Sequence, residues 1–300
     1  MDITRLAHCA FETPDVGRLA DHYEHVVGLR VAQRDADGTA HLAVGAGPPA
    51  ILLHPAEQAR LRHVALELAP GVGAADAAAH LRQRGVAAET ATDAAPGAAA
   101  QVDFEDAGGH AVRLIEPASV EDVLDERPAG GADGIAPEKL GHVARRVSDV
   151  QAVCAFYEDA LGFRVSDWIG DFFVFMRCNP EHHTVNFVRS PSAPALDHLA
   201  FQVHDAAHLT RACDVLASHG IPLIWGPGRH GAGHNLYAYY RNPDDQIVEL
   251  FCDLDVILDE RLGAFDPRPW HEDLPQRPKV WDPEIGANQW GIGVPPEMFR

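Results

Sequence analysis

The sequence predicts an α+β protein of two modules, each a pair of βαβββ units that form a curved mixed sheet around a cleft. Two observations lead to this prediction. Short apolar strands alternate with a few amphipathic helices, and the whole succession occurs twice. The predicted organisation is a first module at 1–120, a linker at 121–138, a second module at 139–262 and a C-terminal tail at 263–300.

The repeat is visible in the spacing of histidines that stand inside apolar strands. His142 follows His8 by 134 residues, and His198 follows His63 by 135 residues. An offset that hardly changes over such a distance indicates a duplicated module with small changes in its loops. The linker between the copies is rich in proline and glycine, which is typical of a connection rather than a packed element.

The elements of the first module follow from caps and periodicity. Asp15 near the start and Gly28 at the end delimit the first helix, and Gly85 stops an alanine-rich second helix. Short apolar runs punctuated by glycine indicate strands. The predicted order is a strand over 3–12, a helix over 14–28, short strands up to 54, a strand over 62–68, a helix over 73–84 and a hairpin over 102–115.

The second module repeats this order. Ser148 is the expected N-cap of its first helix and Gly162 the expected end, while 226–234 is a glycine-rich loop. The predicted order is a strand over 140–144, a helix over 148–162, strands near 163–169, 172–177, 183–188 and 196–201, a helix over 205–220 and a hairpin over 239–251.

Composition excludes several classes of partner. The chain has 24 Lys and Arg against 44 Asp and Glu, a formal charge of −20, which argues against nucleic acid or an anionic membrane. No apolar run reaches the roughly 18 residues of a membrane span, and the N-terminus lacks a signal-peptide pattern. The five cysteines are scattered without a C-x-x-C motif, so we expect reduced thiols in a cytoplasmic protein.

The hairpin near the end of the second module contains an unusual carboxylate. Its turn, at 242–245, is Asn-Pro-Asp-Asp, and its second strand is Ile-Val-Glu-Leu-Phe at 247–251. Four of these five strand residues are large and apolar, and the fifth is Glu249. A buried carboxylate without a partner costs several kcal/mol or becomes protonated. Glu249 therefore needs a cation, and a metal ion is the simplest candidate.

Two histidines on separate strands complete a candidate metal site. His142 and His198 are flanked by apolar residues, as is Glu249, so all three side chains are expected to point inward. Two imidazoles and one carboxylate that leave positions open suit non-haem Fe(II), with Mn(II) as the near alternative. A single histidine on an apolar face is usually a hydrogen-bonded core residue, but three such residues at corresponding strand positions favour a metal.

The first module provides an internal control. His8 and His63 correspond to the two histidine ligands, but the position corresponding to Glu249 is Arg113, which cannot bind a metal. We therefore expect the first module to be metal-free.

Strand parity predicts which residues surround the metal. Residues two positions away from a ligand share its face of the sheet. Ala144, Ala200, Ile247 and Phe251 are therefore expected to line the substrate pocket, and the two small alanines would leave room for a ring substituent.

Five segments of the second module resemble one known family. They are LGHV at 140–143, EHHTVNF at 181–187, DHLAF at 197–201, GPGRH at 226–230 and NPDDQIVELF at 242–251. With the duplicated module they resemble the type I extradiol ring-cleaving catechol dioxygenases of the vicinal oxygen chelate superfamily. The resemblance covers nearly the whole chain. It extends to the tail, which in that family folds back near the active site.

The resemblance implies an activity and a set of roles. The activity is extradiol (meta) cleavage of a catechol by O2 at mononuclear Fe(II), or Mn(II), giving a muconate semialdehyde-type product in aromatic degradation. His142, His198 and Glu249 match the metal ligands, in a homodimer or homotetramer. The remaining matches are His183 as the catalytic histidine, His230 and Tyr239 at the substrate oxygens, and Phe175 near the substrate ring.

One residue departs from the family pattern. Some relatives have Asp or Ser three residues after the histidine of the GRH loop, where this chain has Gly233. A hydrogen-bond or proton-relay link is therefore expected to be missing, or to be carried by water or by His234.

Other functions stay open at this point. One is a different metal enzyme of the superfamily, such as a glyoxalase or a hydroxyphenylpyruvate-type dioxygenase. Glyoxalase-like sites usually take ligands from both modules, and Arg113 argues against that. Another is a metal-free binding protein of the bleomycin-resistance type, or a degenerate copy; the carboxylate of Glu249 argues against both. The sequence leaves the identity of the catechol and the choice between proximal and distal cleavage open.

Overall fold

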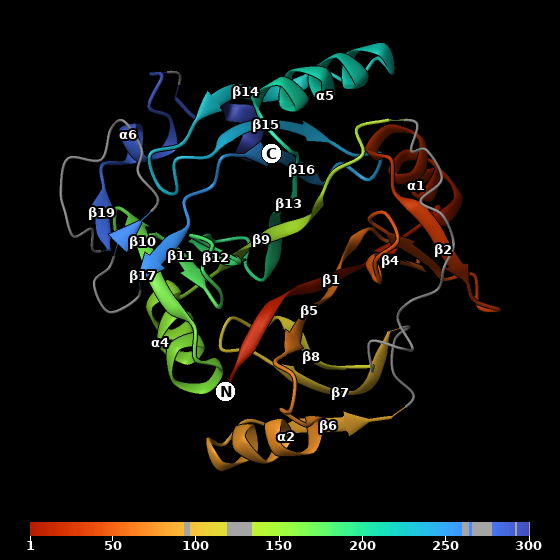
Figure 1. Cartoon of the computed structure of the whole chain (residues 1–300), viewed down its shortest axis with the longest axis vertical. Helices are drawn as coiled ribbons and strands as arrows, with labels where there is room; N and C mark the ends of the chain where they lie inside the picture. Colours follow the sequence, from red (N-terminus) through yellow and green to blue (C-terminus); the bar gives the residue numbers. More distant parts are fainter. Residues whose placement is uncertain (93–96, 119–133, 260–263, 266–277, 292, 300) are drawn as a thin grey trace.

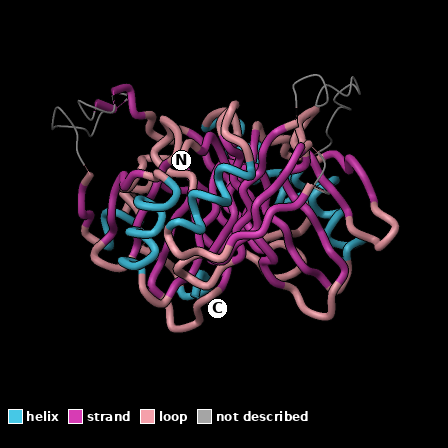
Figure 2. Tube along the Cα trace, turned by 90° about the horizontal axis from the view of Figure 1, so that it is seen from below, coloured by secondary structure: helices cyan, strands magenta, loops and turns pink. Residues whose placement is uncertain are grey.

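A computed structural model of the chain describes residues 1–92, 97–118, 134–259, 264–265, 278–291 and 293–299. Its strands form two large mixed sheets, one from each half of the chain, which confirms the predicted α+β class (Figure 1). Figure 2 shows the strands of both halves side by side with helices packed against them. Most of the predicted linker and part of the predicted tail lie outside the described residues.

The first sheet has eight strands in the order β2-β3-β4-β1-β5-β8-β7-β6. The helix α1 (Val16–His22) begins at Asp15, whose side chain accepts from Arg18 N, and continues as a π-helical turn (Tyr23–Val27). The other elements are β1 (Ile3–Thr13), β2 (Arg30–Arg34), β3 (Ala40–Ala43), β4 (Pro49–Pro55), β5 (Arg60–Leu68), α2 (Ala74–Gln83), β6 (Ala88–Ala91), β7 (Ala98–Glu105) and β8 (Ala111–Pro117).

The second sheet has nine strands in the order β14-β15-β16-β13-β9-β12-β11-β10-β19. Its main strands and helices are β9 (Lys139–Val147), α4 (Val150–Leu161), β10 (Arg164–Ile169), β11 (Phe173–Arg177), β12 (Val185–Arg189), β13 (Ala195–Gln202), α5 (Ala206–Ser218), β14 (Leu223–Arg229), β15 (Leu236–Arg241) and β16 (Ile247–Cys252). The C-terminal elements are β17 (Ile257–Asp259), β18 (Ala264–Phe265), β19 (Lys279–Trp281), α6 (Pro283–Ala287) and a 3₁₀ turn (Pro296–Phe299).

Two local predictions need correction. The N-cap of α4 is Asp149, not Ser148, because its carboxylate accepts from the backbone N–H groups of Gln151 and Ala152. The glycine-rich segment is also not wholly a loop, since its residues 226–229 complete β14.

The three central strands of the second sheet bring the candidate ligands into register. His142 on β9 is paired with Ala200 on β13, and Ala200 is paired in turn with Glu249 on β16. His198 is paired with Ala144. The two histidines and the carboxylate therefore lie on neighbouring strands of one sheet.

The first sheet repeats this register. His8 on β1 is paired with Ala65 on β5, Ala65 is paired with Arg113 on β8, and His63 is paired with Ala10. These pairs are the counterparts of the pairs in the second sheet. Duplication is therefore visible in the hydrogen-bonded pairing as well as in the sequence.

A buried ion pair joins the two modules. Arg145 on β9 donates to Asp106 in the β7–β8 turn at 2.9 Å, and both side chains are fully buried. The hydroxyl of Tyr157 also donates to Asp106, at 3.0 Å, and the guanidinium of Arg145 lies 4.7 Å from the ring centroid of Phe187. A Cβ on Gly108 of the same turn would lie 2.8 Å from Val147, so the modules meet too closely there for a larger residue.

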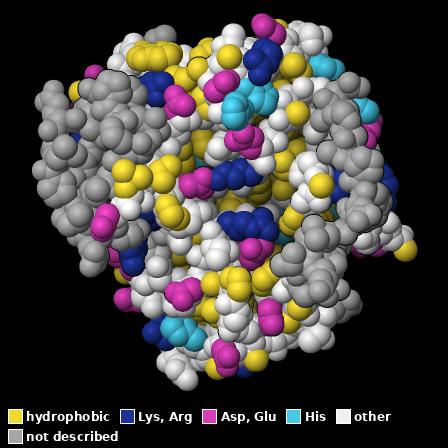
Figure 3. Space-filling model, viewed as in Figure 1, with side chains coloured by type: hydrophobic (Ala, Val, Ile, Leu, Met, Phe, Trp, Pro, Cys, Tyr) yellow, Lys and Arg dark blue, Asp and Glu magenta, His cyan; other side chains and the backbone are white. Residues whose placement is uncertain are grey.

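The surface carries charges of both signs. Figure 3 shows basic and acidic side chains close together around the hollowed middle of one face. None of the helices in the described ranges has both the length and the apolarity needed to cross a bilayer.

Candidate metal centre

Three buried side chains converge on the inner face of the second sheet. The Nε2 atoms of His142 and His198 lie 3.0 and 3.3 Å from the same carboxylate oxygen of Glu249. One ligand atom from each residue lies within 4.8 Å of the other two. Glu249 is 1% exposed, so water does not solvate its charge.

The hydrogen bonds around this triad call for a positive charge at its centre. His198 donates Nδ1–H to Asp197 at 2.8 Å, which leaves Nε2 as a lone pair facing the Glu249 oxygen. Two acceptors 3.3 Å apart repel unless a proton or a cation lies between them. Burial opposes protonation of His198, but its hydrogen bonds to Asp197 and Glu249 outweigh it and raise the pKa to about 9. A divalent metal held by two imidazoles and a carboxylate meets the same demand.

The second oxygen of Glu249 is also held. It accepts from Asn235 Nδ2 at 3.0 Å, and His230 Nε2 lies 3.8 Å away. Burial alone would raise the pKa of Glu249, but the imidazoles of His142 and His198 hold it well below its usual range. The carboxylate is therefore ionised and fixed in orientation, as a metal ligand requires.

The triad opens into a cavity of about 290 Å³. Polar groups are gathered at its metal end: the triad itself, Asp197, His183, Asn186, His230 and Tyr239. No lysine or arginine is among the described residues that line it. The rest of the wall is apolar, formed by Ile169, Phe172, Phe173, Phe175, Val188, Trp225, Pro283, Ala287, Val294 and Met298.

His183 lies directly beside the triad. Its ring centroid is 4.3 Å from that of His142 and 5.2 Å from that of Phe175. Burial, together with the neighbouring rings of His142 and His182, holds the pKa of His183 well below its usual value. His183 is therefore a neutral imidazole next to the candidate metal position.

His230 and Tyr239 form a hydrogen-bonded pair beside the triad, with the Tyr239 ring centroid 5.4 Å from that of His198. His230 Nδ1 donates to the carbonyl of Ala287 at 2.6 Å, so Nε2 is free to accept from the Tyr239 hydroxyl at 3.0 Å. Burial lowers the pKa of His230 to about 4, while burial and Glu249 raise that of Tyr239 well above its usual value. This wall therefore presents a neutral imidazole and a protonated phenol.

The four residues predicted to line the pocket from strand alternation do not line the cavity of the triad. Ala200 and Phe251 are packed with Leu254 beneath the triad, and the Phe251 ring lies 4.8 Å from that of His142. Ala144 is fully buried, and Ile247 lines a different cavity. None of these four lines the cavity of the triad, whereas Phe175 does.

Several lining residues were not predicted. Pro283, Ala287, Val294 and Met298 come from the C-terminal segment, which returns to the second sheet through the parallel pairing of β19 with β10. These apolar residues have no periodicity that would have marked them. Asn186, whose Oδ1 lacks a partner among the described residues, stands in the EHHTVNF strand and could have been noticed there.

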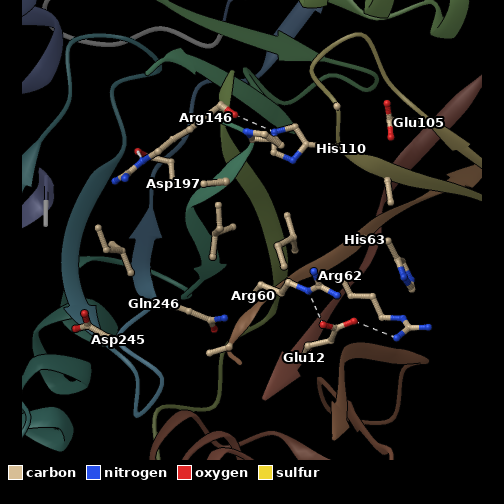
Figure 4. A pocket seen from close by; sticks show the side chains of 18 of the residues that line it. Glu12, Arg60, Arg62, His63, Glu105, His110, Arg146, Asp197, Asp245 and Gln246 are labelled. Atoms are coloured by element: carbon tan, nitrogen blue, oxygen red, sulfur yellow. Dashed lines mark hydrogen bonds and ion pairs between the residues drawn. The ribbon is translucent and has the colours of Figure 1, made fainter. Parts of the chain in front are cut away.

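A larger cavity of about 570 Å³ lies between the modules (Figure 4). Two groups of ion pairs lie in its wall: Glu12 with Arg60 and Arg62, and Arg146 with Asp197 at 3.1 Å. In the first module, Glu12 occupies the position that corresponds to Arg146, and Arg62 the position that corresponds to Asp197. Both modules therefore have an ion pair at these positions, but the acidic and basic partners are exchanged. Neither of the two groups of candidate metal ligands found among the described residues lines this cavity.

The first module has a different arrangement at the counterpart of the triad. His8 Nε2 and His63 Nε2 are hydrogen-bonded to each other at 2.9 Å. Arg113 is turned to Asp103, with Nε 2.6 Å from the carboxylate. The imidazoles are thus satisfied by one another.

The site and the fold agree with known proteins. Residues 139–250 match the Glyoxalase/Bleomycin resistance protein/Dioxygenase superfamily. The iron-dependent extradiol dioxygenase of Rhodococcus jostii is 24% identical over 87% of this chain and 92% of its own length. The manganese-dependent 2,3-dihydroxybiphenyl 1,2-dioxygenase of Geobacillus genomosp. 3 is also 24% identical, over 93% of this chain and 94% of its own length.

A solved structure extends the agreement to the fold. The Mn(II)-bound glyoxalase of Novosphingobium aromaticivorans is 27% identical, covers 99% of this chain and 94% of its own, and has a TM-score of 0.81. The family match lies on the module that holds the triad, and the extradiol dioxygenases align with both modules. Residues 139–250 thus match the glyoxalase, bleomycin resistance protein and dioxygenase superfamily, and the relatives that align along nearly the full length of the chain include extradiol ring-cleaving dioxygenases.

Proposed function

We propose that the protein cleaves the ring of a catechol next to its hydroxyl groups and incorporates both atoms of O2 to give a muconate semialdehyde. The observation that carries the proposal is the buried triad of His142, His198 and Glu249 at the closed end of an aromatic cavity. When bound there, Fe(II), or Mn(II) as the alternative, supplies open coordination positions for the catechol and O2 and the redox chemistry between them.

The side chains around the triad have separate roles in this proposal. His183 is neutral and takes the proton of a catechol hydroxyl, then returns one as the ring opens. His230 and Tyr239 hold the substrate oxygens, since both are at the metal end of the cavity and already hydrogen-bonded to each other. The apolar wall excludes water from the reacting atoms.

The lining also supports a class of catechol. The described wall has ten apolar residues and no cation, so a substituent with a carboxylate would be buried without a partner. Phe173 and Phe175 are stacked with centroids 4.5 Å apart and offer a face to a second ring. We therefore propose an uncharged, aryl-substituted catechol, which is the kind of substrate named for the Geobacillus relative.

The test is a substrate screen on protein that is purified without oxygen and loaded with Fe(II) or Mn(II). Oxygen uptake and the yellow absorbance of the semialdehyde are measured with an aryl-substituted catechol, unsubstituted catechol and a carboxymethyl catechol. We expect the highest kcat/KM for the aryl compound. Absence of uptake with all three compounds would contradict the proposed reaction, and preference for the carboxymethyl compound would contradict the proposed substrate class.

Two variants separate metal binding from catalysis. Glu249→Gln should lose the metal and with it all activity, because the triad loses its charge. His183→Phe should keep stoichiometric metal, measured by elemental analysis, while kcat falls by about 100-fold or more.

A glyoxalase reaction is the second candidate because of the similarity to the Mn(II)-bound glyoxalase. The same preparation is therefore assayed for isomerisation of a glutathione hemithioacetal. All three candidate ligands come from one module, which favours the dioxygenase, and we expect no thioester product.

Cellular location and assembly are also proposals. None of the five cysteines is in a disulfide bond, which supports the cytoplasm. The exposed apolar side chains of Val280, Ile285 and Trp290 support a homodimer or homotetramer.

A further inference from the structure

A chain of buried hydrogen bonds leads from the C-terminal segment to the candidate catalytic histidine. Asp167 on β10 accepts from the backbone N–H of Lys279 at 2.8 Å and from Trp281 Nε1 at 2.7 Å. The same carboxylate lies 3.2 Å from His182 Nε2, and His182 Nδ1 lies 3.0 Å from His183 Nδ1. Asp167, His182 and His183 are 7%, 1% and 3% exposed, so water does not compete for these bonds.

The chemistry of the acceptor fixes the direction of each bond. A carboxylate only accepts, so a neutral His182 carries its proton on Nε2 and has a lone pair on Nδ1. His183 must then donate Nδ1–H to that lone pair, because two lone pairs cannot face each other at 3.0 Å. A neutral imidazole has one N–H, so the Nε2 of His183 is left as a lone pair.

The geometry points to Asp167 and His182 as positioning residues that set the tautomer of His183 and direct its Nε2 lone pair to the substrate hydroxyl. The catalytic part of this inference rests on the proposed function, whereas the tautomer does not. A proton acceptor at this nitrogen is what removal of a catechol proton requires.

Gly233 fits the same arrangement. Its φ is +80°, a conformation that favours glycine, and a Cβ there would lie 3.0 Å from His182 Nδ1. The missing side chain in the GRH loop thus leaves room for the His182 ring. The same His182 nitrogen lies within hydrogen-bond distance of His183.

The C-terminal segment takes part because it occupies two of the hydrogen bonds of Asp167. Lys279 and Trp281 hold the carboxylate in place through β19, which is paired with β10 at Asp167 and Lys279. Docking of this segment therefore orients the whole chain of bonds.

The tautomer can be read directly by two-bond ¹H–¹⁵N correlation spectra of the full-length protein labelled at histidine, both metal-free and loaded with diamagnetic Zn(II). The signals of His183 are assigned by their loss in His183→Phe. We expect the wild type to show a proton on Nδ1 of His183. Asp167→Asn should shift it toward Nε2, because the amide can donate to His182. A proton on Nε2 in the wild type, or an unchanged spectrum in a folded Asp167→Asn, would overturn the inference.

Steady-state kinetics test the positioning role of Asp167 and His182. Asp167→Asn and His182→Phe should lower kcat about 10–100-fold, as loss of an outer hydrogen bond does, with bound metal and KM unchanged. Asp171→Asn is the matched control, since this aspartate is 81% exposed in the adjoining turn. Unchanged kcat in both variants would refute the positioning role. If wild type cleaves no catechol, the proposed function fails, but the spectra still decide the tautomer.

Discussion

At the scale of single residues, Asp197 links the metal centre to the junction between the modules. It accepts from His198 on one side and from Arg146 on the other, and it lines both cavities. The contact with His198 fixes the orientation of that ring, with Nε2 directed toward the metal position.

Asp197→Asn should weaken metal binding. An amide in place of the carboxylate makes His198 a poorer ligand, and such changes typically cost about 10–100-fold in affinity. The affinity for Mn(II) is measured by competition with a chelator, with the exposed Asp171→Asn as control. Equal affinities for both variants and the wild type would show that Asp197 does not tune the ligand.

At the scale of elements, β1 and β5 differ from their counterparts β9 and β13 in the contacts of their histidines. His8 and His63 contact each other, whereas His142 and His198 contact the carboxylate of Glu249. The bond between His8 and His63 needs one imidazole to donate and the other to accept, so the two rings cannot both be protonated. Burial, with Arg113 nearby, lowers the pKa of His8 to about 3.

The first module should therefore lose stability as the pH falls. The unfolded chain binds a proton at His8 below about pH 6.5. The folded chain binds it only near pH 3. Across this window the unfolded state binds more protons, and the stability falls by at most about 1.4 kcal/mol per pH unit for this histidine. Urea unfolding at pH 7 and pH 5 measures the change. The double variant His8→Gln/His63→Gln should show a smaller pH dependence, and an equal one would contradict this origin.

At the scale of the whole molecule, the two modules are held together by charge as well as by apolar packing. Arg145 has no exposure to water, and Asp106 is the carboxylate that compensates it. A buried ion pair is strongly destabilised when one partner is removed, because the other charge stays uncompensated.

Asp106→Asn should lower the free energy of unfolding by about 3–5 kcal/mol. Arg145→Met added to this variant should recover part of the loss, since no buried charge is left. Both are measured by urea unfolding. A loss below about 1 kcal/mol, the size expected for a surface pair, would contradict a structural role for the junction.

The sequence was sufficient for the repeat and for the triad, and physical reasons explain what it left out. A constant offset and a carboxylate in an apolar strand are local signals, and His142, His198 and Glu249 lie together as these signals predicted. Phe251 and Ala200 share the expected face of the sheet but lie beneath the ligands. Alternation along a strand predicts the face on which a side chain lies, but not whether that side chain reaches the cavity. Met298 reaches the cavity only through the return of the C-terminal segment, which no local pattern encodes.

The bond between Arg145 and Asp106 also bears on whether the second module could exist without the first. A chain that lacked the first module would keep the guanidinium of Arg145 but lose the carboxylate that compensates it, together with the surface that covers it. The second module therefore depends on the first, even though all three candidate ligands lie on the second.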